Sequence, residues 1–319
     1  MTNHIIRRRA FLVAASAALI SAGLREARAD AAPNSTGSEP AKLKAPPNAT
    51  DCHMHIYDPR FADTNPRPGL PQIKATVADY RLLQKRTGTT RVVVVTPRNY
   101  GTDNRVTVDA LSQLGASARG VAVVQPDVTD AELKALGEAG IRGIRFSLGG
   151  ADAVTNWDMV EPLAKRAADL GWHVQFNVDG SEIAERAELL RRLPAQLVFD
   201  HMGHPNLPAG VEHPAFAVLR GLLDRGRTWI KLSGAYFNSR VGAPDYPEAA
   251  TIAQAFVKAA PERMVWGSDW PHPSEQAKPP LPNDALLFDL LSVWAPDAAA
   301  RRRILVENPE SLYGFAKST

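Results

Sequence analysis

Short apolar runs alternate with longer amphipathic stretches along most of the chain. The run Val92–Val95 is wholly β-branched, which is typical of a strand buried on both faces. The stretches between such runs are predicted to be helices, with Thr129 and Ser181 as caps and Gly88 and Gly171 as stops. The pattern predicts strands at 50–56, 91–95, 120–124, 142–146, 173–178, 197–201, 228–232 and 264–267, and helices at 77–86, about 105–117, 130–139, 157–170, about 181–193, 214–225, 246–260, 283–294 and 296–307.

Strands that alternate with helices predict a parallel sheet. Eight such units in residues 50–319 fit one α/β domain of the (β/α)8 TIM barrel class. An open doubly wound sheet is the alternative, but no Gly-x-Gly-x-x-Gly follows the first strand. The barrel has a consequence for function, because it makes the first and last strands neighbours.

The start of the chain has a different composition. Arg7-Arg8-Arg9 precede the apolar run Phe11–Leu24, and Ala27-Arg28-Ala29 offers small residues where a signal peptidase cleaves. We therefore expect residues 1–29 to be an export signal peptide. Arg8-Arg9-Ala10-Phe11-Leu12 favours the twin-arginine route over a Sec signal or an uncleaved anchor, and predicts a periplasmic protein.

The leader also accounts for the basic character of the chain. Without its five arginines and one acid, the remainder has 32 basic and 33 acidic residues, a net charge of −1. This balance, without a basic stripe, argues against nucleic acid binding. No later apolar stretch of about 18 residues predicts a membrane span. Residues 30–49, rich in Pro, Ala, Ser and Asn, are predicted to be a flexible linker.

The chain has one cysteine, Cys52, so it forms no intrachain disulfide. Cys52 lies inside the first predicted strand. Side chains alternate along a strand, so Cys52 is expected to face away from His53 and His55. A buried, small apolar side chain is the expected role.

Candidate chemistry lies at the two ends of the predicted barrel. His53 and His55 share one face of the first strand, and Asp269 follows the last. A lone His-x-His is a weak motif, and a lone Asp after a strand is usually a turn residue. A barrel joins them at its carboxyl-terminal rim, where active sites of this fold lie, together with His201 after the sixth strand.

These four residues allow two kinds of chemistry. His53, His55, His201 and Asp269 are suited to hold one Zn²⁺ or Mn²⁺ and to lower the pKa of a bound water. Without a metal, the imidazoles would polarise a carbonyl while Asp269 takes a proton from water. Arg145, placed near a strand end, suits a substrate carboxylate because its guanidinium is a planar fork. The full set predicted to bind substrate is Arg145, Arg98, Asn177, Tyr236, Arg240 and His272.

Three motifs together resemble the amidohydrolase superfamily. They are Asp51-Cys52-His53-Met54-His55, Phe199-Asp200-His201-Met202-Gly203 and Trp266-Gly267-Ser268-Asp269-Trp270-Pro271-His272. With Gly143-Ile144-Arg145-Phe146 and Lys231-Leu232-Ser233-Gly234, they are more narrowly similar to the branch of 2-pyrone-4,6-dicarboxylate hydrolases, sulfomuconolactone hydrolases and galactarolactone isomerases. The resemblance covers about residues 50–315. It implies a (β/α)8 barrel that acts on a small anionic lactone, with Asp269 as general base and the three histidines binding metal or polarising the lactone carbonyl.

The chain departs from the superfamily at two positions. Many members carry a histidine on strand five and a carboxylated lysine on strand four, where Asn177 and Arg145 stand here. The departures argue against a two-metal site and leave one divalent ion or none.

Three functions follow as hypotheses. The first is hydrolysis of a carboxylated or sulfonated lactone, with Asp269 activating water. The second is lactone isomerisation, in which a substrate hydroxyl attacks instead of water; Tyr236–Arg240 is similar to the sugar-lactone isomerases. The third is an exported small-molecule binding protein that keeps the pocket. Each requires only a small-molecule partner, and an oligomer is compatible with all three.

Overall fold

The structure is a computed structural model that describes residues 31–66, 71–150 and 153–318. The predicted signal peptide lies outside these residues. Within them, no helix combines the length and the apolar character needed to cross a bilayer.

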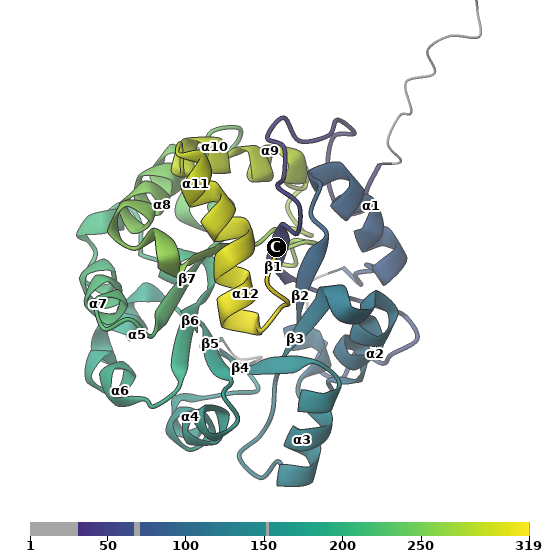
Figure 1. Cartoon of the computed structure of the whole chain (residues 1–319), viewed down its shortest axis with the longest axis vertical. Helices are drawn as coiled ribbons and strands as arrows, with labels where there is room; N and C mark the ends of the chain where they lie inside the picture. Colours follow the sequence, from purple (N-terminus) through teal and green to yellow (C-terminus); the bar gives the residue numbers. More distant parts are fainter. Residues whose placement is uncertain (1–30, 67–70, 151–152, 319) are drawn as a thin grey trace, which may run out of the picture.

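The described residues contain one sheet of eight parallel strands, each paired with the next along the chain (Figure 1). The predicted (β/α)8 barrel is therefore confirmed. The largest differences from the predicted strand ends are of two residues: β1 ends at Met54, β3 begins and ends two residues earlier, and β6 ends at Phe199, before His201. The strands are β1 (Thr50–Met54), β2 (Arg91–Val95), β3 (Ala118–Ala122), β4 (Ile141–Ser147), β5 (His173–Asn177), β6 (Gln196–Phe199), β7 (Thr228–Leu232) and β8 (Met264–Trp266).

Helices surround the sheet and connect its strands (Figure 1). The single helix expected at 181–193 is two helices, and its cap is the side chain of Asp179 rather than Ser181. The α-helices are α1 (Val77–Thr87), α2 (Arg105–Leu114), α3 (Asp130–Glu138), α4 (Val160–Asp169), α5 (Gly180–Glu185), α6 (Ala187–Arg192), α7 (Pro214–Leu223), α8 (Pro247–Ala259), α9 (Asp284–Asp289), α10 (Leu291–Trp294), α11 (Ala298–Arg302) and α12 (Asn308–Tyr313). Short 3₁₀ turns are η1 (Arg98–Tyr100), η2 (Gly115–Ser117), η3 (Trp157–Met159), η4 (Asp200–Gly203), η5 (Gly210–Glu212), η6 (Ala235–Asn238) and η7 (Pro261–Arg263), and Arg303–Glu307 forms a π turn.

The inside of the barrel has its own apolar cluster, closed at one end by the end of the chain. Val93 and Val95 point into it, and Tyr313 and Phe315 cover it where α12 crosses the barrel (Figure 1). Cys52 is buried, as expected, but it belongs to this inner cluster and so faces inward, as His53 does. The prediction that it faces away from the histidines was wrong. The register between β1 and β2 shifts between Asp51 and Met54, and such a bulge breaks the alternation of side chains.

The barrel closes between β1 and β8 through the buried carboxylate of Asp51. Its Oδ1 accepts hydrogen bonds from the backbone N–H groups of His53 (3.1 Å) and Ser268 (2.9 Å). Its Oδ2 accepts from the Ser268 hydroxyl (2.6 Å) and from Tyr80 on α1 (3.0 Å). The backbone N–H of Asp269 in turn donates to the carbonyl of His53 (2.8 Å). The Asp51 side chain thus links the first strand, β1, to the last strand, β8.

Residues 31–49, predicted to be a flexible linker, instead pack along the barrel near α1 and α9 (Figure 1). Trp270 donates from Nε1 to the carbonyl of Pro33 (2.8 Å), and Thr36 donates from its hydroxyl to the carbonyl of Leu281 (2.9 Å). The guanidinium of Arg86 donates to the Glu39 carbonyl (2.8 Å). Composition suggested a tether, but it could not report these partners, which lie far away in sequence. We call residues 31–49 the N-terminal segment.

We predict that replacing Asp51 with alanine lowers the free energy of unfolding by roughly 3–5 kcal/mol, because it leaves four buried donors without an acceptor. Urea unfolding measures the change. Asp127→Ala, at an exposed position, serves as control and should stay within about 0.5 kcal/mol of the parent. A loss below about 1 kcal/mol for Asp51→Ala would contradict the closing role.

Candidate active site

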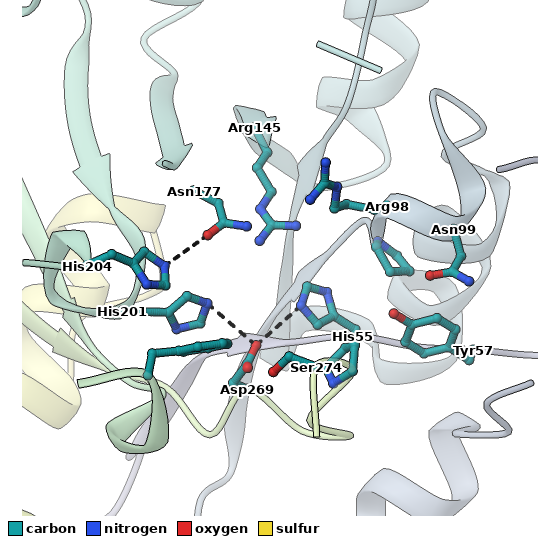
Figure 2. A pocket seen from close by; sticks show the side chains of 13 residues that line it. His55, Tyr57, Arg98, Asn99, Arg145, Asn177, His201, His204, Asp269 and Ser274 are labelled. Carbon is teal, nitrogen blue, oxygen red and sulfur yellow. Dashed lines mark hydrogen bonds and ion pairs between the residues drawn. The ribbon is translucent and has the colours of Figure 1, made fainter. Parts of the chain in front are cut away.

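Four side chains from three strand ends meet at the rim of the barrel, and Figure 2 shows three of them, His55, His201 and Asp269. The Oδ1 atom of Asp269 lies 3.3 Å from His53 Nε2, 3.4 Å from His55 Nε2 and 3.8 Å from His201 Nε2. All four residues are at most 3% exposed. The structure thus brings together the residues that the sequence singled out as a catalytic and metal-binding set.

Unusual backbone conformations aim two of these side chains. His201 has φ = 50° and Met202 has φ = 61°, directly after β6 ends at Phe199. Asp269 has φ = 60° after β8. Left-handed conformations are costly for residues with a side chain and concentrate at functional sites. Because the chain turns so sharply after Phe199, the side chains of Asp200 and His201 both point to the barrel centre.

A hydrogen bond fixes the tautomer of His55. Its Nδ1 lies 2.8 Å from the carbonyl oxygen of Val95, which only accepts, so Nδ1 carries the proton. The Nδ1 of His53 lies 3.1 Å from a carboxylate oxygen of Asp200 and 3.2 Å from Lys231 Nζ, a donor, so these contacts hold the ring in place without selecting its tautomer. In the neutral form, the Nε2 of His55 presents a lone pair 3.3 Å from His53 Nε2 and next to Asp269 Oδ1. The lone pairs of His55 Nε2 and Asp269 Oδ1 repel unless a cation or a proton lies between them.

Burial favours the neutral form of His55 and His201, while the surroundings of Asp269 favour its charged form. Burial lowers the pKa of His55 to about 4, although the bond with Asp269 opposes the shift. Burial likewise holds the pKa of His201 well below its ordinary value. Burial alone would raise the pKa of Asp269, but His201, His53 and His55 outweigh it and hold that pKa well below its usual range. The site therefore offers neutral nitrogen donors and an ionised oxygen, the forms that bind a metal or accept a proton.

A second layer of buried charge lies beneath this site and was missed by sequence reasoning. Asp200 accepts from Arg145 Nε (3.2 Å) and Gln175 Nε2 (3.1 Å), and Lys231 Nζ lies 3.5 Å from it. Burial raises the pKa of Asp200, but His53, Lys231 and Arg145 outweigh it, so its pKa is well below normal. Burial lowers the pKa of Lys231 to about 8. The available signal was a lysine inside the apolar strand β7, which requires a buried partner.

A pocket opens above Asp269 (Figure 2). Arg145 and Arg98 lie on the side opposite the carboxylate, and Asn177 binds His204 Nε2 (3.1 Å) beside them. This arrangement sets positive charge across from the base. The wall consists of His55, Tyr57, Pro97, Arg98, Asn99, Arg145, Asn177, His201, His204, Phe237, Asp269, Pro273 and Ser274.

Three of the six residues predicted to bind substrate do not line this pocket. Tyr236 and His272 lie behind Asp269, where Tyr236 bonds its Oδ2 and His272 is fully buried. Arg240 is exposed on the loop after η6. Proximity to a strand end placed all three near the rim, but it does not state which way a loop directs a side chain. Arg145, Arg98 and Asn177 do line the wall.

The donor set fits a single divalent ion. His53, His55 and Asp269 form a group whose ligand atoms are 3.3, 3.3 and 3.4 Å apart. Tetrahedral zinc with bonds of 2.0–2.1 Å separates its ligands by roughly 3.3–3.4 Å. Asp200 and Val95 hold the outer nitrogens of the two rings, as partners of metal-bound histidines do. Three ligands beside an open pocket match the pattern of a catalytic rather than a structural site.

Comparisons with known proteins agree with this geometry. A family model described as amidohydrolase matches residues 50–315. The chain is 35% identical over 279 residues to a 2-pyrone-4,6-dicarboxylate hydrolase of Comamonas testosteroni, covering 83% of this chain and 90% of that protein. It is also 35% identical over 268 residues to a D-galactarolactone isomerase of Agrobacterium fabrum, with the same coverage. Among solved structures, a probable 2-pyrone-4,6-dicarboxylic acid hydrolase of Acinetobacter baumannii, with citric acid bound, superposes with a TM-score of 0.72 at 27% identity, covering 84% of this chain and 100% of that one.

We predict that Zn²⁺ or Mn²⁺ stabilises chelator-treated protein through His53, His55 and Asp269. An ion at about 100 times its Kd would add about 2.7 kcal/mol and raise Tm by roughly 5 °C. The shift should disappear in His55→Gln and persist in His213→Gln, which alters a histidine at the start of α7 instead. Equal Tm values with and without both ions, together with no metal in elemental analysis, would instead favour the metal-free mechanism.

Proposed function

The chain belongs to the amidohydrolase family, and we propose that it opens a small anionic lactone by hydrolysis, with Asp269 as general base. One observation carries the proposal: a buried, ionised carboxylate faces neutral imidazoles on one side of a pocket whose other side holds two arginines. A binding protein would need the arginines but no buried base. The likeness to a 2-pyrone-4,6-dicarboxylate hydrolase over most of both chains supports the lactone.

The proposed reaction begins with water above Asp269. Its proton passes to Oδ1 while its oxygen bonds to the lactone carbonyl carbon, and the carbonyl electron pair moves to oxygen. The tetrahedral intermediate then collapses, the ring C–O bond breaks, and the departing oxygen takes the proton back from Asp269. A divalent ion bound by His53, His55 and Asp269 would supply Lewis acidity toward the carbonyl oxygen.

The arginines define the substrate class. Arg145 is 3% exposed, and its Nε is held by Asp200 in a fixed direction toward the pocket. Arg98 is steadied by a bond from Nη2 to the carbonyl of Gly149 (2.7 Å). Two oriented guanidinium groups favour a carboxylate or sulfonate on the lactone, placed away from the scissile bond. Binding through this remote group would hold the carbonyl over Asp269.

Lactone isomerisation is the second candidate, because a D-galactarolactone isomerase matches the chain at the same identity as the hydrolase. In that reaction a hydroxyl of the substrate replaces water as the nucleophile, and the same base serves. Turnover in ¹⁸O-water separates the two: hydrolysis places the label in the product, and isomerisation does not. Suitable probes are 2-pyrone-4,6-dicarboxylate, 4-sulfomuconolactone and D-galactarolactone.

We predict that Asp269→Asn lowers kcat at least about 10³-fold on whichever probe the parent turns over, since the amide cannot accept the proton. The hydrogen-bonding shape of the side chain is retained, so urea unfolding should change by less than about 1 kcal/mol. Asp245→Asn, on an exposed loop, is the control. A kcat within tenfold of the parent would reject Asp269 as the base.

We further propose export to the periplasm by the twin-arginine route, on the strength of the leader sequence. Changing Arg8 and Arg9 together to lysine should leave the uncleaved protein in the cytoplasm, as judged by fractionation. Changing Arg7 alone to lysine, outside the pair, should leave export intact. Periplasmic protein from the double variant would point to the Sec route.

A further inference from the structure

We infer that Tyr236, His272 and Asp284 form a positioning chain that decides which oxygen of Asp269 faces the substrate. The inference goes beyond the proposed function but rests on it, because it assigns residues that act on the base from behind. None of the three lines the pocket. They come from η6, the loop after β8 and the first residue of α9.

The positioning chain begins with a short hydrogen bond from Tyr236 to the base, Asp269. The phenol of Tyr236 donates to Asp269 Oδ2 at 2.5 Å, the length of a strong bond to an ionised acceptor. The other oxygen, Oδ1, faces the three imidazoles at 3.3 to 3.8 Å. The two oxygens of Asp269 therefore have different roles. Oδ2 is held by the protein, and Oδ1 is left for the ion or the water.

The positioning chain continues behind the phenol of Tyr236 with His272 and Asp284. The oxygen of Tyr236 lies 3.2 Å from His272 Nδ1, and His272 Nε2 lies 3.0 Å from Asp284 Oδ2. His272 thus lies between the phenol and the Asp284 carboxylate, with one ring nitrogen facing each. The three side chains form a continuous line of contacts that ends at Asp269 Oδ2.

Full burial protects these contacts from exchange with water. His272 and Asp284 are both 0% exposed. Linked hydrogen bonds in such a buried place polarise one another, which strengthens the bond from the phenol to Asp269. A side chain at position 272 that does not bond the phenol would lose this effect even if it filled the same volume.

Asp284, the last member of the positioning chain, is anchored by other parts of the fold. The backbone N–H of Asp284 donates to the hydroxyl of Ser35 (3.2 Å), in the N-terminal segment. Arg86 on α1 donates to that same hydroxyl (2.9 Å) and to Asn283 Oδ1 (2.6 Å). Asp284 is therefore held in place, and Tyr236 is held against Asp269 through His272.

The expected consequence is a loss of turnover rather than of substrate binding. Without the phenol, the Asp269 side chain is free to rotate and to turn either oxygen toward the imidazoles. The arginines that hold the anionic substrate lie across the pocket from Asp269 (Figure 2), whereas Tyr236, His272 and Asp284 do not line the pocket. Tyr236→Phe should therefore lower kcat about 10- to 100-fold and change KM less than about threefold, as expected for a misplaced reactive group.

The kinetic test compares Tyr236→Phe with Tyr246→Phe, which removes a hydroxyl from a buried tyrosine outside the pocket. Tyr246→Phe should keep the parental kcat. His272→Gln and Asp284→Asn should each lower kcat with KM preserved, and combining either with Tyr236→Phe should add little, since all act through one bond. A Tyr236→Phe variant with parental kcat, or one whose KM rises as kcat falls, would overturn the inference.

A measurement without substrate separates this inference from the proposed function. In zinc-loaded or metal-free protein, the short bond between Tyr236 and Asp269 should give a far-downfield proton resonance. The resonance should be absent in Tyr236→Phe and present in Tyr246→Phe. If no lactone is turned over but this pattern holds, the proposed function is wrong and the positioning role of Tyr236 is supported. If lactones are turned over and the resonance is unaffected by Tyr236→Phe, only the positioning role is wrong.

Discussion

The buried carboxylate of Asp51 is the constraint on which the site depends. It accepts four hydrogen bonds, two of them from backbone N–H groups on the two sides of the junction between β1 and β8. A parallel barrel must join its first and last strands without a connecting turn. Here the Asp51 side chain joins them at the base of the rim, and backbone bonds from the Asp269 N–H to the His53 carbonyl and from the His55 N–H to the Trp270 carbonyl continue the junction. Residues more than two hundred positions apart are thereby brought within about 3.5 Å of one another.

Above this junction, the charges are arranged in two layers. The lower layer pairs Asp200 with Arg145 and Lys231, and the upper layer presents Asp269 to neutral imidazoles. Buried ions are tolerable only when each has a partner, and Asp200 provides it for two cations at once. It also lies 3.1 Å from His53 Nδ1, on the side of the ring away from Asp269, whose Oδ1 faces Nε2. The lower layer therefore helps to orient the upper one, and Arg145 links both to the substrate.

The sequence predicted the fold and the four central residues because both follow from strand periodicity and from one geometric rule, that strand ends of a barrel meet. What it could not predict depends on local departures from that periodicity. Cys52 turns inward because β1 bulges, and Asp200 joins His201 at the centre because the chain enters a left-handed conformation after Phe199. The N-terminal segment has the composition of a linker, and only its distant partners, such as Trp270, make it part of the fold. Tyr236 and His272 were expected in the pocket because sequence position gives the loop but not the direction of its side chains.

The last two of these departures, the N-terminal segment and the Tyr236–His272 pair, have one physical origin. A carboxylate that acts at a pocket needs one oxygen exposed to the reaction and the other restrained, and restraint must come from behind, where substrate cannot reach. Tyr236 supplies it directly, while Ser35 and Arg86 hold the start of α9, which carries Asp284. The N-terminal segment, α1 and α9 thus bear on one carboxylate although none of them lines the pocket, and η6 provides both Tyr236 behind the base and Phe237 in the pocket wall. Sequence variation in the pocket wall can then change the lactone that is accepted, while the geometry of the base is set by parts of the chain that the substrate never touches.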